Sequence, residues 1–196
     1  MTRHYSFAHR SVPVEGWCAR TLEDGAYHPD GGGAWPEPAT ALRYATGRHL
    51  HVVDMDDAGA GRVKISLDAG VMLSDFARWC ASQVLHLWDA PRIVHRYLET
   101  GDDALSAAAW ASAARAARRV QWQSGAAARC AYWSALCAQA SCESLPQVAA
   151  AHAAQAAADA LAYSRPRQAG DRDTIYDREW ESIAAELRRR VQDLTE

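Results

Sequence analysis

The sequence predicts an α+β protein in which a small β region, residues 1–72, packs on an alanine-rich array of about six helices, residues 73–196. Before Leu73 the chain is mixed and punctuated by Gly and Pro, whereas residues 106–162 are largely alanine interrupted by Arg, Trp and Cys. Alanine has the highest helix propensity and the smallest side chain, so we expect helices that approach one another closely. A chain of 196 residues suits one domain, or two small regions that share a core.

Short segments of β-type residues predict four strands in the N-terminal region, at residues 5–8, 17–21, 49–55 and 62–67. Turn signals separate them at residues 23–25, 29–33 and 56–61. The last of these, DDAGAG, is typical of a hairpin loop. A short helix is predicted at residues 40–45, ending at Gly47.

The helical region begins with a helix that Ser74 is expected to cap. Its apolar residues recur at steps of three and four and are Leu73, Phe76, Cys80, Val84 and Leu87. Asp89 is expected to cap a second, shorter helix, which has Pro91 in its first turn and stops at Gly101.

Capping and breaking residues predict three further helices, at about residues 103–123, 126–141 and 146–163. Asp102 or Asp103 begins the first of them, the pair Ser124 and Gly125 precedes the second, and Ser144 with Pro146 opens the third. Ala126, Cys130, Trp133, Cys137 and Ala140 form a stripe with heptad spacing on the second.

The final helix, at about residues 174–194, follows a linker rich in Arg, Pro, Gly and Asp and has the clearest amphipathic pattern in the chain. Its apolar stripe consists of Tyr176, Trp180, Ile183, Leu187, Val191 and Leu194. Acidic residues come early and Arg188, Arg189 and Arg190 come late, as the helix dipole favours. A helix docked on the core is the ordinary interpretation, and a detachable partner-binding helix is the alternative.

Aromatic side chains have to fill the volume that alanine leaves, and the chain has eight Trp but two Phe. A buried Trp removes roughly 200 Å² from water. The tryptophans expected to plug gaps between helices are Trp79, Trp110, Trp122, Trp133 and Trp180. If Ala114 and Ala127 are buried among these helices, leucine at either position destabilises the protein.

The composition bounds the partners and the location of the protein. The formal net charge is −3 and Lys64 is the single lysine, so no overall basic excess indicates nucleic-acid binding. Five cysteines, an odd number, occur without a signal peptide or an uninterrupted apolar span. These features predict a reduced, cytoplasmic protein without a membrane segment.

No catalytic site, metal site or cofactor is predicted, because each candidate has a simpler structural interpretation. Cys130 and Cys137, with Cys142 and His152, offer metal-binding groups, but no C-x-x-C pair is present, and free Cys packs as a small apolar residue. His152, Gln155 and Asp159 form a polar stripe, in which the His and the Asp lie about 10 Å apart along the helix axis. A solvated face is the simpler account of that stripe.

Two candidates in the β region are treated in the same way. Asp54, Asp56 and Asp57 offer carboxylates for Mg²⁺, but Gly59 and Gly61 follow them and make a turn the simpler account. The glycine-rich residues 29–33 lack the Lys-Ser/Thr ending of a phosphate-binding loop.

Arginine clusters near the ends of two helices carry the binding hypothesis. The candidate partner-binding residues are Arg115, Arg118, Arg119, Trp122, Arg188, Arg189 and Arg190. Arg and Trp dominate the energetics of protein interfaces, which favours a protein partner. Arginine beside an aromatic ring also suits nucleic-acid stacking, and pairing with the helix dipole or with acids elsewhere is the structural alternative.

The segment FARWCASQVLHLWDAPRIVHRYLETGDDALSAAAWASAARAAR, residues 76–118, resembles a group of bacterial and phage proteins of unknown function. That group shares a mixed β N-terminal region, a motif of the type FAxxCAxxVLHLW and a helical stretch of Ala/Trp/Arg repeats. Residues 34–56 are similar to its loop–helix–strand unit, and related alanine-rich helices occur in immunity proteins (Imm-5-like). The resemblance implies a phage or mobile-element accessory protein that acts in phage–host or toxin–immunity conflict.

The leading hypothesis is therefore a non-enzymatic inhibitor that binds a host-defence protein, in the manner of an anti-CRISPR protein, or a toxin. A nucleic-acid-binding regulator that uses the arginine-rich helix edges is the alternative. An enzyme of the N-terminal region, ADP-ribosyltransferase-like and using acids such as Asp54, is a third hypothesis. The alanine-rich helices also suit a homodimer.

Overall fold

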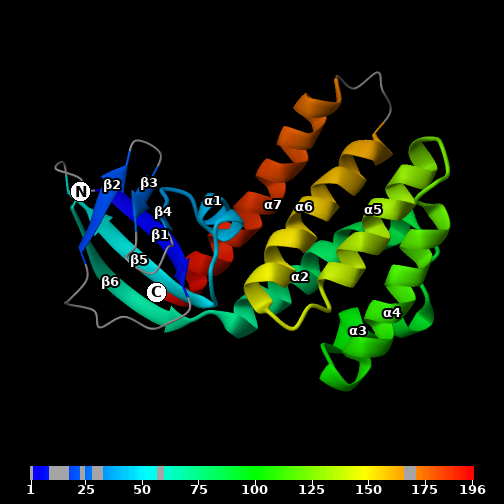
Figure 1. Ribbon diagram of the computed structural model, residues 1–196, viewed down its shortest axis with the longest axis horizontal. Helices are drawn as coiled ribbons and strands as arrows, with labels where there is room; N and C mark the ends of the chain where they lie inside the picture. The colour runs from blue at the N-terminus through cyan, green and yellow to red at the C-terminus, as the bar shows by residue number, and fades with distance from the viewer. Residues whose placement is uncertain (1, 9–17, 23–24, 28–32, 57–59, 166–170) are drawn as a thin grey trace. The chain divides into compact units, whose positions relative to one another are not determined.

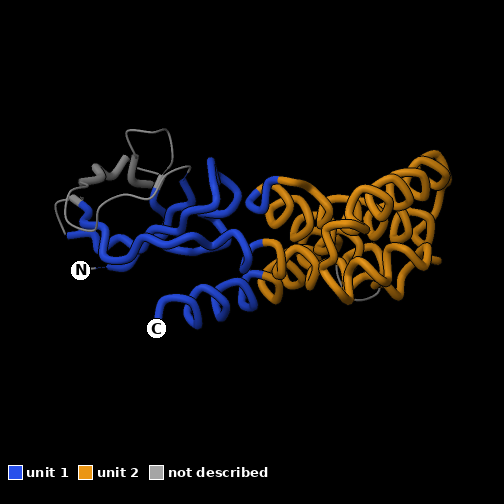
Figure 2. Tube along the Cα trace, turned by 90° about the horizontal axis from the view of Figure 1, so that it is seen from below, with its two compact units in different colours: residues 1–73, 145–147, 184–196 blue, residues 74–144, 148–183 orange. Residues whose placement is uncertain are grey.

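The computed structural model describes residues 2–8, 18–22, 25–27, 33–56, 60–165 and 171–196. The described residues form the predicted α+β fold, with the strands in the first part of the chain and most of the helices after them (Figure 1). The chain divides into two compact units (Figure 2). The sheet unit comprises residues 1–73, 145–147 and 184–196, and the helical unit comprises residues 74–144 and 148–183.

The sheet unit is built on one antiparallel sheet with the strand order β1-β5-β6-β2-β3-β4. The strands are β1 Thr2–Ala8, β2 Cys18–Leu22, β3 Gly25–Tyr27, β4 Gly33–Ala34, β5 His49–Met55 and β6 Ala60–Asp68. The outer strands of this order approach each other where Tyr5 and Trp35 exchange two backbone hydrogen bonds of 2.7 and 2.8 Å. This bridge joins β1 to Trp35, the residue that directly follows β4.

The predicted hairpin between β5 and β6 is consistent with their antiparallel pairing, although the tip of DDAGAG at residues 57–59 lies outside the described residues. Most of the glycine-rich run at 29–33 is outside them too. The sequence does not predict β3 and β4, because both begin with a glycine, a residue typical of turns.

The core of the sheet unit lies on both faces of β5. Val53 and Met55 cluster with Ala34 and Val63, while Leu50 and Val52, two of the other residues of β5, are buried as well. Helix α1, Pro38–Arg43, packs against β1 and begins at a proline, two residues before the predicted start. The last part of helix α7, Arg172–Thr195, belongs to this unit from Ala184 onward and buries Leu187 and Val191.

From residue 70 onward the described residues form the predicted number of α-helices and one additional 3₁₀ turn, Leu85–Leu87. The α-helices are α2 Gly70–Val84, α3 Arg92–Thr100, α4 Asp103–Val120, α5 Ala126–Ala140, α6 Pro146–Ser164 and α7 Arg172–Thr195. Within the helical unit, α4 packs against both α3 and α5.

Two of the predicted helix boundaries are confirmed in detail. Gly101 ends α3 in the left-handed conformation, with φ of 64°, and a Cβ atom there would lie 2.5 Å from the Arg78 guanidinium carbon. Asp102 then caps α4 by accepting a hydrogen bond of 2.9 Å from the Ala104 N–H. A single Gly-Asp pair therefore ends one helix and begins the next.

Two predicted helix starts are wrong. Helix α2 begins at Gly70, not after Ser74, because the Asp68 carboxylate accepts the Gly70 N–H at 2.8 Å. Helix α3 begins at Arg92 with Pro91 in the cap position, and Asp89 makes no cap. Helix α7 begins at Arg172, close to the predicted start at about residue 174.

The helical unit buries many of its alanines, but two of the five tryptophans expected to plug gaps between helices are exposed instead. Nine alanines of α6 are buried: Ala149, Ala150, Ala153, Ala154, Ala156, Ala157, Ala158, Ala160 and Ala162. Trp122 is 87% exposed and Trp110 is 39% exposed, which corrects the prediction for these two plugs. Ala114 is buried on α4, whereas Ala127 is exposed on the first turn of α5.

Candidate functional site

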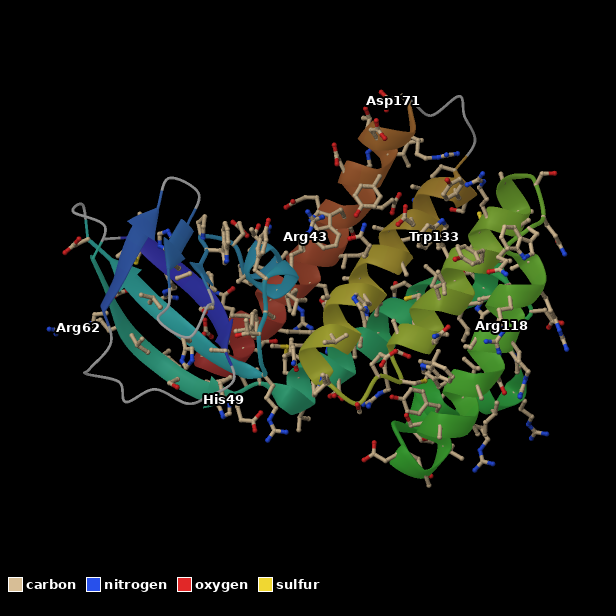
Figure 3. All side chains as sticks on the ribbon, viewed as in Figure 1. Arg43, His49, Arg62, Arg118, Trp133 and Asp171 are labelled. Atoms are coloured by element: carbon tan, nitrogen blue, oxygen red, sulfur yellow. The ribbon has the colours of Figure 1, made fainter. Side chains whose placement is uncertain are left out.

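The predicted edge of α4 lies at the C-terminal end of that helix. Arg115, Arg118 and Arg119 are all exposed, and Trp122 follows them beyond the last turn. Arg118 lies on the outer side of α4 (Figure 3). Arg115 donates to the Ser112 hydroxyl at 3.2 Å, and none of the three arginines pairs with a carboxylate of the described residues. We call these four residues the α4 edge.

The second predicted cluster, Arg188, Arg189 and Arg190, belongs to the sheet unit and differs in its electrostatics. Arg188 contacts Glu37 at 2.9 Å, Arg189 contacts Glu186 at 2.8 Å and Asp193 at 2.6 Å, and Arg190 contacts Glu186 at 2.7 Å. Hydrogen bonds from Arg189, and then from Arg190, hold the pKa of Glu186 below its usual range. These arginines have carboxylate partners within their own unit.

A cavity that the sequence does not predict opens in the helical unit, close along the chain to the α4 edge. It has a volume of about 750 Å³ and is lined by Gly125, Ala126, Arg129, Ala162, Tyr163, Arg165, Asp171, Arg172 and Ile175. Gly125 lies three residues after Trp122, and Asp171 stands at the start of α7 (Figure 3). We call this cavity the arginine pocket.

Tyr163, near the end of α6, organises the two arginines of the pocket. The Arg172 Nη1 donates to the Tyr163 Oη at 3.0 Å, and the Arg129 Nη1 donates to the same oxygen at 3.3 Å. The Arg172 guanidinium carbon also lies 3.8 Å from the centre of the tyrosine ring, which is a cation–π contact. Three helices thus bring two guanidinium groups to one oxygen atom.

The acids around the pocket are engaged in local contacts. The Asp171 carboxylate accepts hydrogen bonds from the N–H groups of Asp173 and Thr174 at 2.8 and 3.0 Å, and from the Thr174 hydroxyl at 3.1 Å. The bonds from Thr174 lower the pKa of Asp171, which caps α7. Glu179 pairs with Arg165 at 3.0 Å. Neither Arg129 nor Arg172 lies within 4.0 Å of a carboxylate oxygen of the described residues.

The N-terminus of α5 adds backbone donors to the same cavity. Gly125 occupies its cap position with φ of 110°, makes no side-chain cap, and is followed by a first turn without an acidic residue. The first N–H groups of a helix have no partner within the helix. Gly125 and Ala126 both line the arginine pocket, so the positive end of the α5 dipole lies at this pocket.

The polar stripe of α6 contributes to this region in part. His152 and Gln155 are exposed, and Asp159 is half-buried. Burial raises the pKa of Asp159, while the Arg172 charge and a hydrogen bond from Gln155 act in the opposite direction. Asp159 therefore interacts with Gln155 and Arg172.

The other candidates of the sequence lie apart from these groups. Asp54 lies 3.8 Å from Lys64 in an ion pair, and Asp57 is outside the described residues. Within the described ranges no three His, Cys, Asp or Glu side chains are grouped to hold a metal ion. Cys130, Cys137 and Cys142 are buried, and burial raises the pKa of each thiol.

The arginine pocket escapes sequence reasoning because its residues come from three helices. Arg129, Tyr163 and Arg172 are separated by 34 and 9 positions, so no local spacing connects them. Arg172 also falls in the segment that the sequence assigns to a linker. The one local signal is the first turn of α5, where Gly125 precedes alanines without any acid.

Comparison with known proteins gives no match: no family model, no curated protein and no solved structure is similar enough to this chain. Among the helices of the described residues, none combines the length and the apolar character that crossing a lipid bilayer requires.

Proposed function

We propose that this chain is an accessory protein of a phage or another mobile element, and that it acts as a non-enzymatic inhibitor by binding a host-defence protein or a toxin. The α4 edge is the binding surface. The observation that carries the proposal is the exposure of Trp122, at 87%, next to arginines that have no carboxylate partner among the described residues. The resemblance of residues 76–118 to the phage and immunity group supports the biological setting.

The energetics of interfaces favour such a surface. Trp and Arg are the residues that most often carry a large share of binding energy, and a few of them suffice. An indole in water gains free energy when a partner covers it, because it buries a large apolar area. An unpaired guanidinium offers a planar fork to a carboxylate of the partner. The α4 edge therefore fits a partner with an acidic rim around an apolar pocket.

The electrostatics favour a protein over a nucleic acid as the partner. The net charge of the chain is −3, and the second arginine cluster, Arg188 to Arg190, is already paired with Glu37, Glu186 and Asp193. The nucleic-acid hypothesis depends on two arginine clusters. Only one of them, the α4 edge, has arginines without a carboxylate partner among the described residues. A nucleic-acid site gains most of its affinity from many phosphate contacts, each of which needs a free positive charge.

The test is affinity purification from a nuclease-treated host lysate, using the tagged chain and two variants. The edge variant carries Arg118→Glu, Arg119→Glu and Trp122→Ala. The control variant carries Arg92→Glu and Arg96→Glu, two exposed arginines of α3 in the same unit. We expect one protein to co-purify in stoichiometric amount with the wild type and the control, and its recovery to fall at least about tenfold with the edge variant.

Two outcomes contradict the proposal. The first is that no protein is recovered in stoichiometric amount. The second is equal recovery with the edge variant and the control, which removes the α4 edge from the contact. If nuclease treatment abolishes the recovery of every partner, and the purified chain binds duplex or single strands with a steep salt dependence, nucleic acid is the ligand instead.

A further inference from the structure

We infer that the arginine pocket binds a small organic molecule through a phosphate monoester group, independently of the α4 edge. The two arginines Arg129 and Arg172 donate to a single tyrosine oxygen at 3.3 and 3.0 Å, so two positive charges are held next to each other. Like charges at this separation repel, and no carboxylate of the described residues lies within 4.0 Å of either group. An anion in the pocket balances this charge.

Tyr163 prepares both guanidinium groups for such an anion. Its oxygen accepts from Arg129 and Arg172, which uses its two acceptor positions and leaves its own O–H proton to be donated elsewhere. No described residue accepts that proton. Each arginine uses one Nη1 donor on the tyrosine and keeps its remaining N–H groups for a ligand. The pocket therefore presents donors from three side chains.

The set of donors suits a phosphate better than a carboxylate. A phosphate monoester has three terminal oxygen atoms and up to two negative charges, so it accepts from two guanidinium forks at once. A carboxylate has two oxygens and one charge, which a single fork satisfies. The free N–H groups at the start of α5, with no capping side chain and no acid in the first turn, supply further donors of the kind that bind phosphate.

The size and lining of the pocket point to an organic ligand rather than to free phosphate. Its volume of about 750 Å³ falls within the range of small-molecule sites, which is roughly 300 to 1,000 Å³. Ala126, Ala162 and Ile175 provide apolar surface beside the polar groups. The single acid of the lining, Asp171, caps α7, and Arg165 is shared with Glu179. Asp159, outside the lining, feels the charge of Arg172, but neither Arg129 nor Arg172 has a carboxylate oxygen of the described residues within 4.0 Å.

Isothermal titration of the full chain tests this inference with adenosine monophosphate as the probe. Adenosine, inorganic phosphate and citrate are titrated in parallel. We expect saturable binding of adenosine monophosphate with a Kd below about 1 mM, weakened by salt, and binding at least about tenfold weaker for each of the other three compounds. Arg129→Gln and Arg172→Gln should each weaken the binding at least about tenfold, because each removes one charged fork.

The controls separate loss of the site from loss of the fold. Arg92→Gln/Arg96→Gln removes two exposed arginines of the same unit and should leave the affinity unchanged. Tyr163→Phe keeps the ring beneath Arg172 but removes the shared oxygen, and should weaken binding several-fold with an unchanged circular dichroism spectrum. Absence of saturable binding overturns the inference, as does equal binding of adenosine or citrate, or an unchanged affinity in both arginine variants. If inorganic phosphate binds as tightly as adenosine monophosphate, the inference that the ligand is an organic molecule is wrong.

Discussion

Four cysteine side chains are buried in the helical unit, Cys80, Cys130, Cys137 and Cys142, and their surroundings determine how their thiols react. The Cys137 thiol donates to the Ala153 carbonyl oxygen at 3.1 Å. Burial raises the pKa of Cys142 to about 11, since a thiolate loses its hydration there. A thiol reacts as its thiolate, so burial protects all four thiols, and a raised pKa adds protection at Cys130, Cys137 and Cys142.

We therefore predict that the four buried thiols resist modification in the folded protein. The test uses the Cys18→Ser variant and 5,5′-dithiobis(2-nitrobenzoate) at pH 8. A thiol with a pKa of about 11 has roughly a hundredfold less thiolate at this pH than an ordinary one. We expect no fast-reacting thiol without denaturant and four in guanidinium chloride. A fast equivalent in the folded variant would show that one of these thiols is accessible.

At the scale of single helices, the sequence predicts boundaries well where one residue type has one role. Gly101 and Asp102 end α3 and begin α4 as predicted, because a left-handed residue favours glycine and a free N–H favours a carboxylate. Ser74 and Asp89 are residue types that often cap helices, but neither of them caps a helix, so both predictions are wrong. Asp68 accepts the first N–H of α2 from outside the helix, a contact that depends on the preceding strand.

The same reasoning explains how much of the candidate site follows from the sequence. Arg115, Arg118 and Trp122 share one helix end, so their spacing predicts that they lie together. The arginine pocket needs the ends of α5, α6 and α7 to meet, and uniform alanine gives little information about which helices are neighbours. The sequence therefore predicts which residues share one helix end, but it does not predict which alanine-rich helices are neighbours.

Close packing of alanine predicts a specific difference between two positions. Ala114 on α4 is 4% exposed, whereas Ala127 on the first turn of α5 is exposed. Ala114→Leu adds three carbon atoms where there is no room and should lower the free energy of unfolding by roughly 1–3 kcal/mol. Ala127→Leu keeps a strong helix former in water and should change it by less than about 0.5 kcal/mol. Urea unfolding followed by circular dichroism measures both values, and equal effects would contradict the close packing at Ala114.

At the scale of the whole molecule, helix α7 is one continuous helix whose residues belong to two units. Residues up to Ile183 are part of the helical unit, and Ala184–Glu196 are part of the sheet unit. Leu187 and Val191 are buried in the sheet unit, where Arg188 also pairs with Glu37 at 2.9 Å. The sheet unit thus takes part of its buried core from the last residues of the chain.

This division predicts which unit loses stability when a buried side chain of α7 is shortened. Leu187 is 1% exposed, so Leu187→Ala should cost about 2–5 kcal/mol through lost burial and the cavity it leaves. The loss should appear first in the sheet unit, because domains open locally in cooperative units. Hydrogen exchange followed by mass spectrometry measures this directly, in peptides from β5 and from α5.

The expected pattern is faster exchange in β5, His49–Met55, with little change in α5, Ala126–Ala140. Leu194→Ala is the matched control, since Leu194 lies on the same helix but is 36% exposed and should leave both peptides nearly unchanged. If Leu187→Ala accelerates exchange equally in β5 and α5, the two units unfold together, and α7 couples them into one cooperative structure.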